Sequence, residues 1–151
     1  SSRLFQSVRE RLGLCYSIVG YPTAYENNGA FIIYTSTSPE NVELAVTAIR
    51  KEIDLLLKEG ITAEELRKGK GQIVTGMVLG QESTSAVMRG MGRHAVATGK
   101  LYDIDEQIAK AEAVTCSDVA EVAAKIFDFG RVFASCVSPS PVDVRKMIKE
   151  A

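Results

Sequence analysis

The chain has 151 residues, of which 46% are hydrophobic, so it is long enough for one domain with its own core. Its 18 basic and 19 acidic residues give a net charge of −1 without a long basic run, which argues against a nucleic-acid-binding protein. Its longest apolar stretches are far shorter than the roughly 20 residues of a membrane span, so we expect no such span.

The three cysteines, Cys15, Cys116 and Cys136, argue against two kinds of site. Their odd number and the lack of a C-x-x-C spacing fit neither a disulfide framework nor a thiolate zinc site. We interpret them as buried reduced thiols, which behave as small hydrophobes. Reduced thiols favour a cytosolic or matrix-like compartment, and we expect a cytoplasmic location.

The first predicted element is a short amphipathic helix. Ser2 is a suitable N-cap, the helix is expected to run to about Leu12, and Gly13 follows as the residue that ends it. Its apolar stripe comprises Leu4, Phe5, Val8 and Leu12.

Two β-rich runs follow the helix, at residues 16–21 and 29–37. Between them, Tyr21-Pro22 and residues 26–29 have the composition of turns. The pair therefore predicts an antiparallel hairpin with a rather long loop.

Several helices are predicted next from their capping residues. A long helix begins at Pro39 and ends at Gly60, and the next begins at a capping box of Thr62 and Glu65 and ends near Glu82. Further helices are expected from Ser83 to Gly99, from Asp103 to about Ala113, and from Thr115, paired with Asp118, to about Phe127. Interior glycines disfavour a helix, so we expect close helix packing near Gly76 and Gly80 to offset them.

The end of the chain reads as a strand over residues 131–137 and a short helix over 142–148. Few parallel strand–helix–strand units fit this order, so the predicted class is α+β, with an antiparallel sheet covered by several helices. No linker interrupts the chain, and we expect one domain over residues 1–151.

The opening segment resembles a known enzyme family. It reads Ser1-Ser2-Arg3-Leu4-Phe5-Gln6, then Val8-Arg9-Glu10, then Gly13-Leu14 and Tyr16-Ser17. This pattern is similar to that of the pitrilysin/insulinase zinc metallopeptidases, and mitochondrial processing peptidase and its bacterial relatives are the most similar. Weaker matches follow at Ala63-Glu64-Glu65-Leu66 with Lys70 and at Val114-Thr115-Cys116-Ser117-Asp118-Val119.

The resemblance implies that the chain is an N-terminally truncated second half of such an enzyme. In this family two halves enclose extended peptides, and only the first half carries the zinc motif H-x-x-E-H. This chain has one histidine, His94, and cannot build that motif. We therefore expect no cofactor in this chain, zinc in the partner half, and no activity of the chain alone. We also expect self-association through an uncovered sheet edge, unless the helices cover the sheet.

The resemblance also assigns roles to Arg9 and Tyr16, which match a pair that the second half contributes to the facing active site. Arg9 is expected to donate to substrate carbonyls, and Tyr16 to the developing oxyanion. From the residues alone, Arg9 and Arg11 flank the apolar stripe on opposite sides, and helix geometry does not choose between them. Without the resemblance, the favoured interpretation is that Arg9 pairs with a nearby acid and that Tyr16 is an amphipathic strand residue. Arg3 is expected to be solvated near Glu10.

Two function classes stay open at this point. One is the substrate-enclosing half of a zinc metalloendopeptidase, whose partners are the zinc-bearing half or subunit and extended peptide substrates. The other is a non-catalytic structural or peptide-binding subunit of the same fold.

Overall fold

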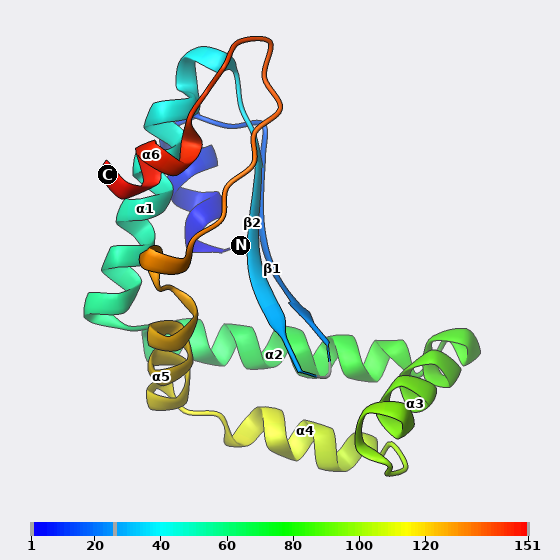
Figure 1. Ribbon diagram of the computed structural model, residues 1–151. Coiled ribbons are helices and arrows are strands. Elements are labelled where there is room, and N and C mark those ends of the chain that lie inside the picture. The colour runs from blue at the N-terminus through cyan, green and yellow to red at the C-terminus, as the bar shows by residue number, and fades with distance from the viewer. Residues whose placement is uncertain (1, 26, 151) are drawn as a thin grey trace. The chain divides into compact units, whose positions relative to one another are not determined.

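The computed structural model describes residues 2–25 and 27–150. They divide into two compact units, Ser1–Gly60 with Glu121–Ala151, and Ile61–Ala120, each of which is described by itself. Helices and one two-stranded antiparallel sheet confirm the predicted α+β class (Figure 1). The single domain over 1–151 stays a prediction.

The first unit begins with the helix η1 (Phe5–Arg11), which has π-helical rather than α-helical hydrogen bonding. The Oγ of Ser2 accepts a hydrogen bond from the backbone N–H of Phe5 at 3.2 Å, as the predicted cap requires. Gly13 has φ of +63°, a left-handed conformation that glycine adopts at little cost, and it ends the helix as expected. The π form was not anticipated, and such turns occur often at functional sites.

The predicted hairpin is confirmed as β1 (Ser17–Ala24) and β2 (Gly29–Ser36). The turn predicted at Tyr21-Pro22 is wrong, because both residues lie within β1, where Pro22 is opposite Phe31. A two-stranded sheet leaves an edge of each strand free, so the N–H that proline lacks need not break a ladder bond. The connection between the strands is correspondingly shorter than expected.

The core of this unit lies between η1, the hairpin and α1 (Val42–Glu59), which follows the short 3₁₀ helix η2 (Pro39–Asn41). Its buried members are Val8, Cys15, Ile18 and Ala45. Helix α6 (Val144–Glu150), which starts two residues later than predicted, lies along α1 (Figure 1). There the Nη1 of Arg50 donates to the carbonyl of Ile148 at 2.8 Å.

The second unit contains α2 (Ala63–Gly80), α3 (Thr84–Thr98) and α4 (Ile104–Ala113), and α2 packs along α4. The caps predicted at Thr62, Ser83 and Asp103 are all present. Helix α5 (Cys116–Ile126) begins directly after Thr115, which exchanges hydrogen bonds with Asp118 in the first turn of the helix, as predicted. No residue from 61 to 120 is buried, so this unit has no core of its own.

The strand predicted at residues 131–137 is wrong. The 3₁₀ helix η3 (Phe129–Arg131) precedes an irregular segment in which Phe133 is 92% and Val137 103% exposed. Strand-forming residues make a strand only beside another strand, and within residues 2–25 and 27–150 this segment forms no ladder. Its apolar side chains are left in water.

Two further expectations are also corrected. Close helix packing does not explain Gly76 and Gly80, because a Cβ at either position would meet no atom within 4 Å. The cysteines are free, but only Cys15 is buried, whereas Cys136 is exposed. Among the described helices, none has the length and apolar character needed to cross a bilayer.

Candidate functional site

Arg9 and Tyr16 lie at the junction of η1 and the hairpin. Arg9 is in the last turn of η1, where its carbonyl accepts a hydrogen bond from the N–H of Gly13 at 3.2 Å. Tyr16 directly precedes β1, and its backbone N–H donates to the carbonyl of Ser36 at 2.8 Å. Hydrogen bonds therefore hold the backbones of both residues. Arg9 is exposed, and Tyr16 is 82% exposed.

The side chains of Arg9 and Tyr16 lie near each other at this junction. The guanidinium carbon of Arg9 lies 4.7 Å from the ring centroid of Phe5 and 6.0 Å from that of Tyr16. Both distances fall in the range in which a cation is attracted to the face of an aromatic ring. The arrangement presents a cation and a phenol side by side, although the sequence separates them by a helix end and a glycine.

The surroundings of Arg9 and Arg11 differ in the structure, whereas helix geometry alone did not separate the two and only the family motif pointed to Arg9. Arg11 forms an ion pair with Glu52 of α1, with 3.5 Å between Nη2 and Oε1. Among the described residues, no acid lies within ion-pair distance of Arg9. The interpretation of Arg9 as one half of a structural ion pair is therefore not supported, and its N–H donors are available to a ligand.

Arg3 does not occupy the solvated position expected for it. Its Nη2 donates to the carbonyl of Gly60 at 2.9 Å, and the residue is half-buried. Gly60 ends α1 with φ of +73°, so Arg3 binds a carbonyl at the C-terminal end of that helix. Arg3 therefore fastens the start of the chain to α1, which is a structural role.

The side chains that the structure describes do not fit a zinc ion. His94 is the single histidine, and its ring packs edge-on against Tyr102 with 5.6 Å between centroids. Over residues 2–25 and 27–150, no three His, Cys, Asp or Glu side chains are placed to share a metal. A zinc site of the usual kind needs at least three such ligands.

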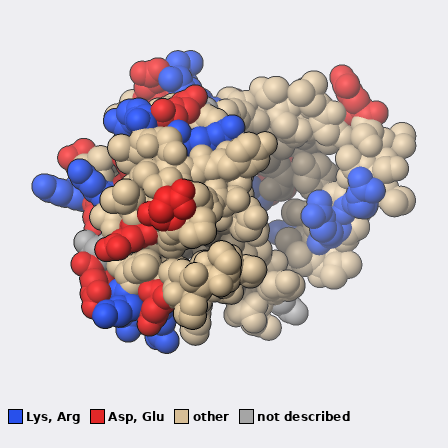
Figure 2. All heavy atoms as spheres, turned by 90° about the horizontal axis from the view of Figure 1, so that it is seen from above, with Lys and Arg blue, Asp and Glu red and all other residues tan. Residues whose placement is uncertain are grey.

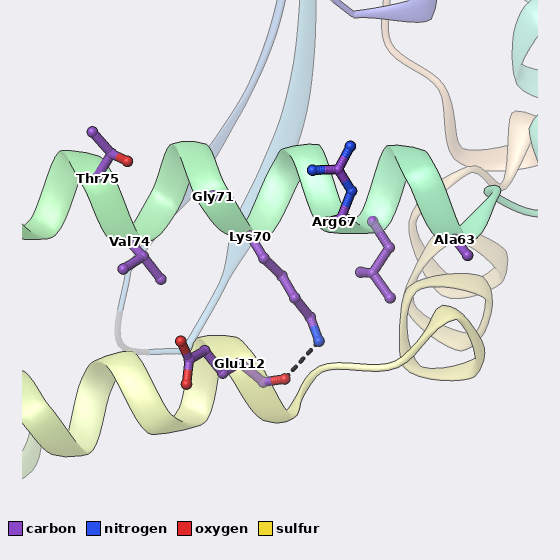
Figure 3. Close-up of a pocket in the computed structure, with 8 residues that line it drawn as sticks. Ala63, Arg67, Lys70, Gly71, Val74, Thr75 and Glu112 are labelled. Atoms are coloured by element: carbon purple, nitrogen blue, oxygen red, sulfur yellow. Dashed lines mark hydrogen bonds between the residues drawn. The ribbon is translucent and has the colours of Figure 1, made fainter.

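A shallow groove of about 470 Å³ lies along α2, where α4 faces it (Figure 3). Lys70 extends from α2 toward α4, and its Nζ donates to the carbonyl of Glu112 at 2.5 Å. That carbonyl is near the C-terminal end of α4, where a cation is favourable. Lys70 thus joins two helices, which is a structural role.

The acids at the helix starts are explained by capping and ion pairs. Hydrogen bonds from the backbone N–H and the hydroxyl of Thr115 lower the pKa of Asp118. A hydrogen bond from Lys68, one turn later, lowers the pKa of Glu64. Figure 2 shows Lys and Arg interspersed with Asp and Glu over the visible face, unlike the single-sign surface that binds nucleic acid.

Comparison with known proteins matches residues 1–73 to the family model described as the Peptidase M16 inactive domain. The chain is 36% identical to an uncharacterized zinc protease of Streptomyces coelicolor over 82% of its own length, and 35% identical to one of Bacillus subtilis over 93%. It spans only 27% and 34% of those two relatives.

Two solved structures share the fold. A chain of complex III2 from Candida albicans superposes with a TM-score of 0.71 at 19% identity, over 83% of this chain and 30% of that one. A conserved protein from Enterococcus faecalis gives 0.70 at 22% identity, over 82% and 29%. The sequence had indicated both the fold and the pair at the helix–strand junction, but not the stacking of Arg9 on Phe5.

Proposed function

Because this chain belongs to the M16 peptidase family, we propose that it is the substrate-enclosing half of a zinc metalloendopeptidase of the processing-peptidase kind. The observation that carries the proposal is the exposed Arg9–Tyr16 pair, in which Arg9 has no acidic partner among the described residues. Both residues are exposed and their backbones are hydrogen-bonded at the junction, as a group serving a facing active site requires.

Arg9 binds the backbone of an extended peptide in this proposal. A guanidinium carries five N–H donors in a planar fork and keeps its charge at every physiological pH. Arg11 has the same chemistry but is held by Glu52, so it is the natural control for Arg9.

Tyr16 donates its phenol O–H to the negative charge that develops on the carbonyl oxygen during cleavage. A fixed donor at that oxygen contributes about 2.7–4 kcal/mol to transition-state stabilisation in other hydrolases. The hydrogen bond from Tyr16 N–H to Ser36 fixes the backbone from which the phenol extends. Fixed placement matters because a donor that must first be ordered contributes less.

The partner in this proposal is the zinc-bearing half, on the same polypeptide or on another subunit. The relatives are named zinc proteases, and the side chains described here do not fit zinc. The unit from 61 to 120 also offers an apolar surface, because it has no buried residue and exposes Ile73, Val78, Leu79, Met88, Met91, Val96 and Leu101. Exposed apolar areas of this kind are typical of surfaces that another protein covers.

A non-catalytic structural or peptide-binding subunit is the second candidate. The likeness to a chain of complex III2, at 19% identity, carries the fold alone and does not choose between the two candidates. This candidate requires neither Arg9 nor Tyr16 to affect any reaction.

The test measures zinc-dependent cleavage of a fluorogenic peptide by the full-length protein, or by the complex if the zinc half is a separate subunit. Arg9→Ala and Tyr16→Phe should each lower kcat/KM by about 10²–10³ with zinc content unchanged. Arg11→Ala should stay near the wild type, since Arg11 is already engaged by Glu52. Wild-type kinetics in both site variants would refute the catalytic role, and a folded, zinc-free, inactive assembly would favour the second candidate.

A further inference from the structure

We propose that Phe5 is the positioning residue of Arg9, in a role that rests on the proposed contact of Arg9 with substrate. Of the two rings near the guanidinium, Phe5 is the closer, at 4.7 Å from the guanidinium carbon to the ring centroid against 6.0 Å for Tyr16. The ring of Phe5 is therefore the nearer of the two aromatic rings that the guanidinium of Arg9 contacts.

Phe5 is suited to this role because the core holds it. Its side chain is half-buried and packs against the cluster that contains Val8, Cys15 and Ile18. Tyr16, in contrast, is 82% exposed and is not part of the core. A ring packed against the core is a better support for a long side chain than a ring that is mostly exposed to water.

The form of η1 places the two residues on one face. Residues four apart are neighbours on a helix surface, and Phe5 and Arg9 have this spacing. In a π-helix the hydrogen bonds run from residue i to i+5, so the face repeats after four to five residues. The carbonyl of Ser7 accepts the N–H of Leu12 in this way, at 3.1 Å.

A ring orients a guanidinium without using its hydrogen-bond donors. Attraction to an aromatic ring acts through the face of the planar cation, whereas its N–H groups point outward from the edge. A carboxylate partner lies instead at the edge that carries the N–H groups, as Glu52 does at 3.5 Å from Nη2 of Arg11. The junction therefore keeps Arg9 both ordered and available, which a substrate-binding arginine requires.

The experiment compares Phe5→Leu with Phe5→Tyr in the full-length peptidase. Leu keeps the apolar contact with the core but removes the ring, and we expect kcat/KM to fall about two- to fivefold, mainly through KM. Tyr keeps the ring and should restore wild-type values. Phe31→Leu is the matched control, because Phe31 packs on Phe127, with 5.3 Å between ring centroids, and no contact of its ring with Arg9 is found.

A double-mutant comparison separates positioning from general destabilisation. In an Arg9→Ala background, Phe5→Leu should cause no further loss, since there is no guanidinium left to orient. An equal loss in both backgrounds, or the same loss from Phe31→Leu, would overturn the positioning role. If Phe5→Leu does not fold, Phe5→Met takes its place, because it retains similar volume without a ring.

The outcome also distinguishes this inference from the function on which it rests. Wild-type kinetics of both Arg9→Ala and Tyr16→Phe would refute the proposed function itself, and wild-type kinetics of Arg9→Ala alone would refute the substrate contact on which this inference rests. A strong effect of Arg9→Ala together with wild-type kinetics of Phe5→Leu would refute only the positioning role.

Discussion

Replacing helical glycines by alanine should stabilise this chain, although glycines in a helix often mark close packing. Gly71 and Gly76 lie inside α2, both are exposed, and a Cβ at either position would meet no atom within 4 Å. Alanine is favoured over glycine in a helix interior by about 0.8–1 kcal/mol. Because nothing crowds the new methyl group, we expect Gly71→Ala and Gly76→Ala each to raise the free energy of unfolding by about that amount.

The matched controls are glycines that the fold does require. A Cβ at Gly29 would lie 2.7 Å from the carbonyl oxygen of Thr23, and Gly99 has φ of +69° at the end of α3. Gly29→Ala and Gly99→Ala should therefore lower stability, the first through a clash and the second through backbone strain. The glycines thus divide into two groups whose substitutions have opposite signs.

The assay is thermal and urea unfolding of the isolated chain, followed by circular dichroism at low concentration. An increase of about 1 kcal/mol corresponds to roughly 2–4 °C in the melting temperature for a chain of this size. The variant Gly71→Ala/Gly76→Ala should show nearly the sum, because the sites share no contact. A loss of stability in both single variants would refute the reasoning and would mean that another molecule or copy packs on this face of α2.

The remaining predictions concern metal, acid and association. Metal analysis of the isolated chain should find no stoichiometric zinc, because no three described His, Cys, Asp or Glu side chains are placed to share a metal ion. One tightly held zinc ion per chain would contradict this expectation. The folded-state pKa of Asp118 lies below its ordinary value of 3.8, so its stabilisation of α5 is present above that value and is lost as pH falls through the lowered pKa. An NMR titration should show this, and Asp118→Asn should abolish that pH-dependent step. Sedimentation of the pure chain should reveal self-association, because the unit from 61 to 120 has no buried residue; a monomer at high concentration would disprove it.

The helix boundaries could be predicted from the sequence because the interactions that set them are local. The side chains of the caps Thr62, Ser83, Asp103 and Thr115 each accept a hydrogen bond from a backbone N–H within three residues. In the capping box, the side chain of Glu65 also accepts a hydrogen bond from the backbone N–H of Thr62. Bonds over so short a span form whatever the rest of the fold does. The same reason explains why Gly13 and Gly99 ended helices as expected.

The tertiary structure alone decided the features that depend on distant residues. Residues 131–137 have the composition of a strand but lack a ladder partner within the described chain, and Pro22 could join β1 only because that strand has a free edge. The family motif pointed to Arg9 rather than Arg11, but the ion pair of Arg11 with Glu52, 41 positions farther along the chain, could not be read from the sequence. Ladder bonds, ion pairs and ring contacts join residues that only folding brings together, so the sequence pattern could not predict them, whereas it did predict the local caps and helix ends.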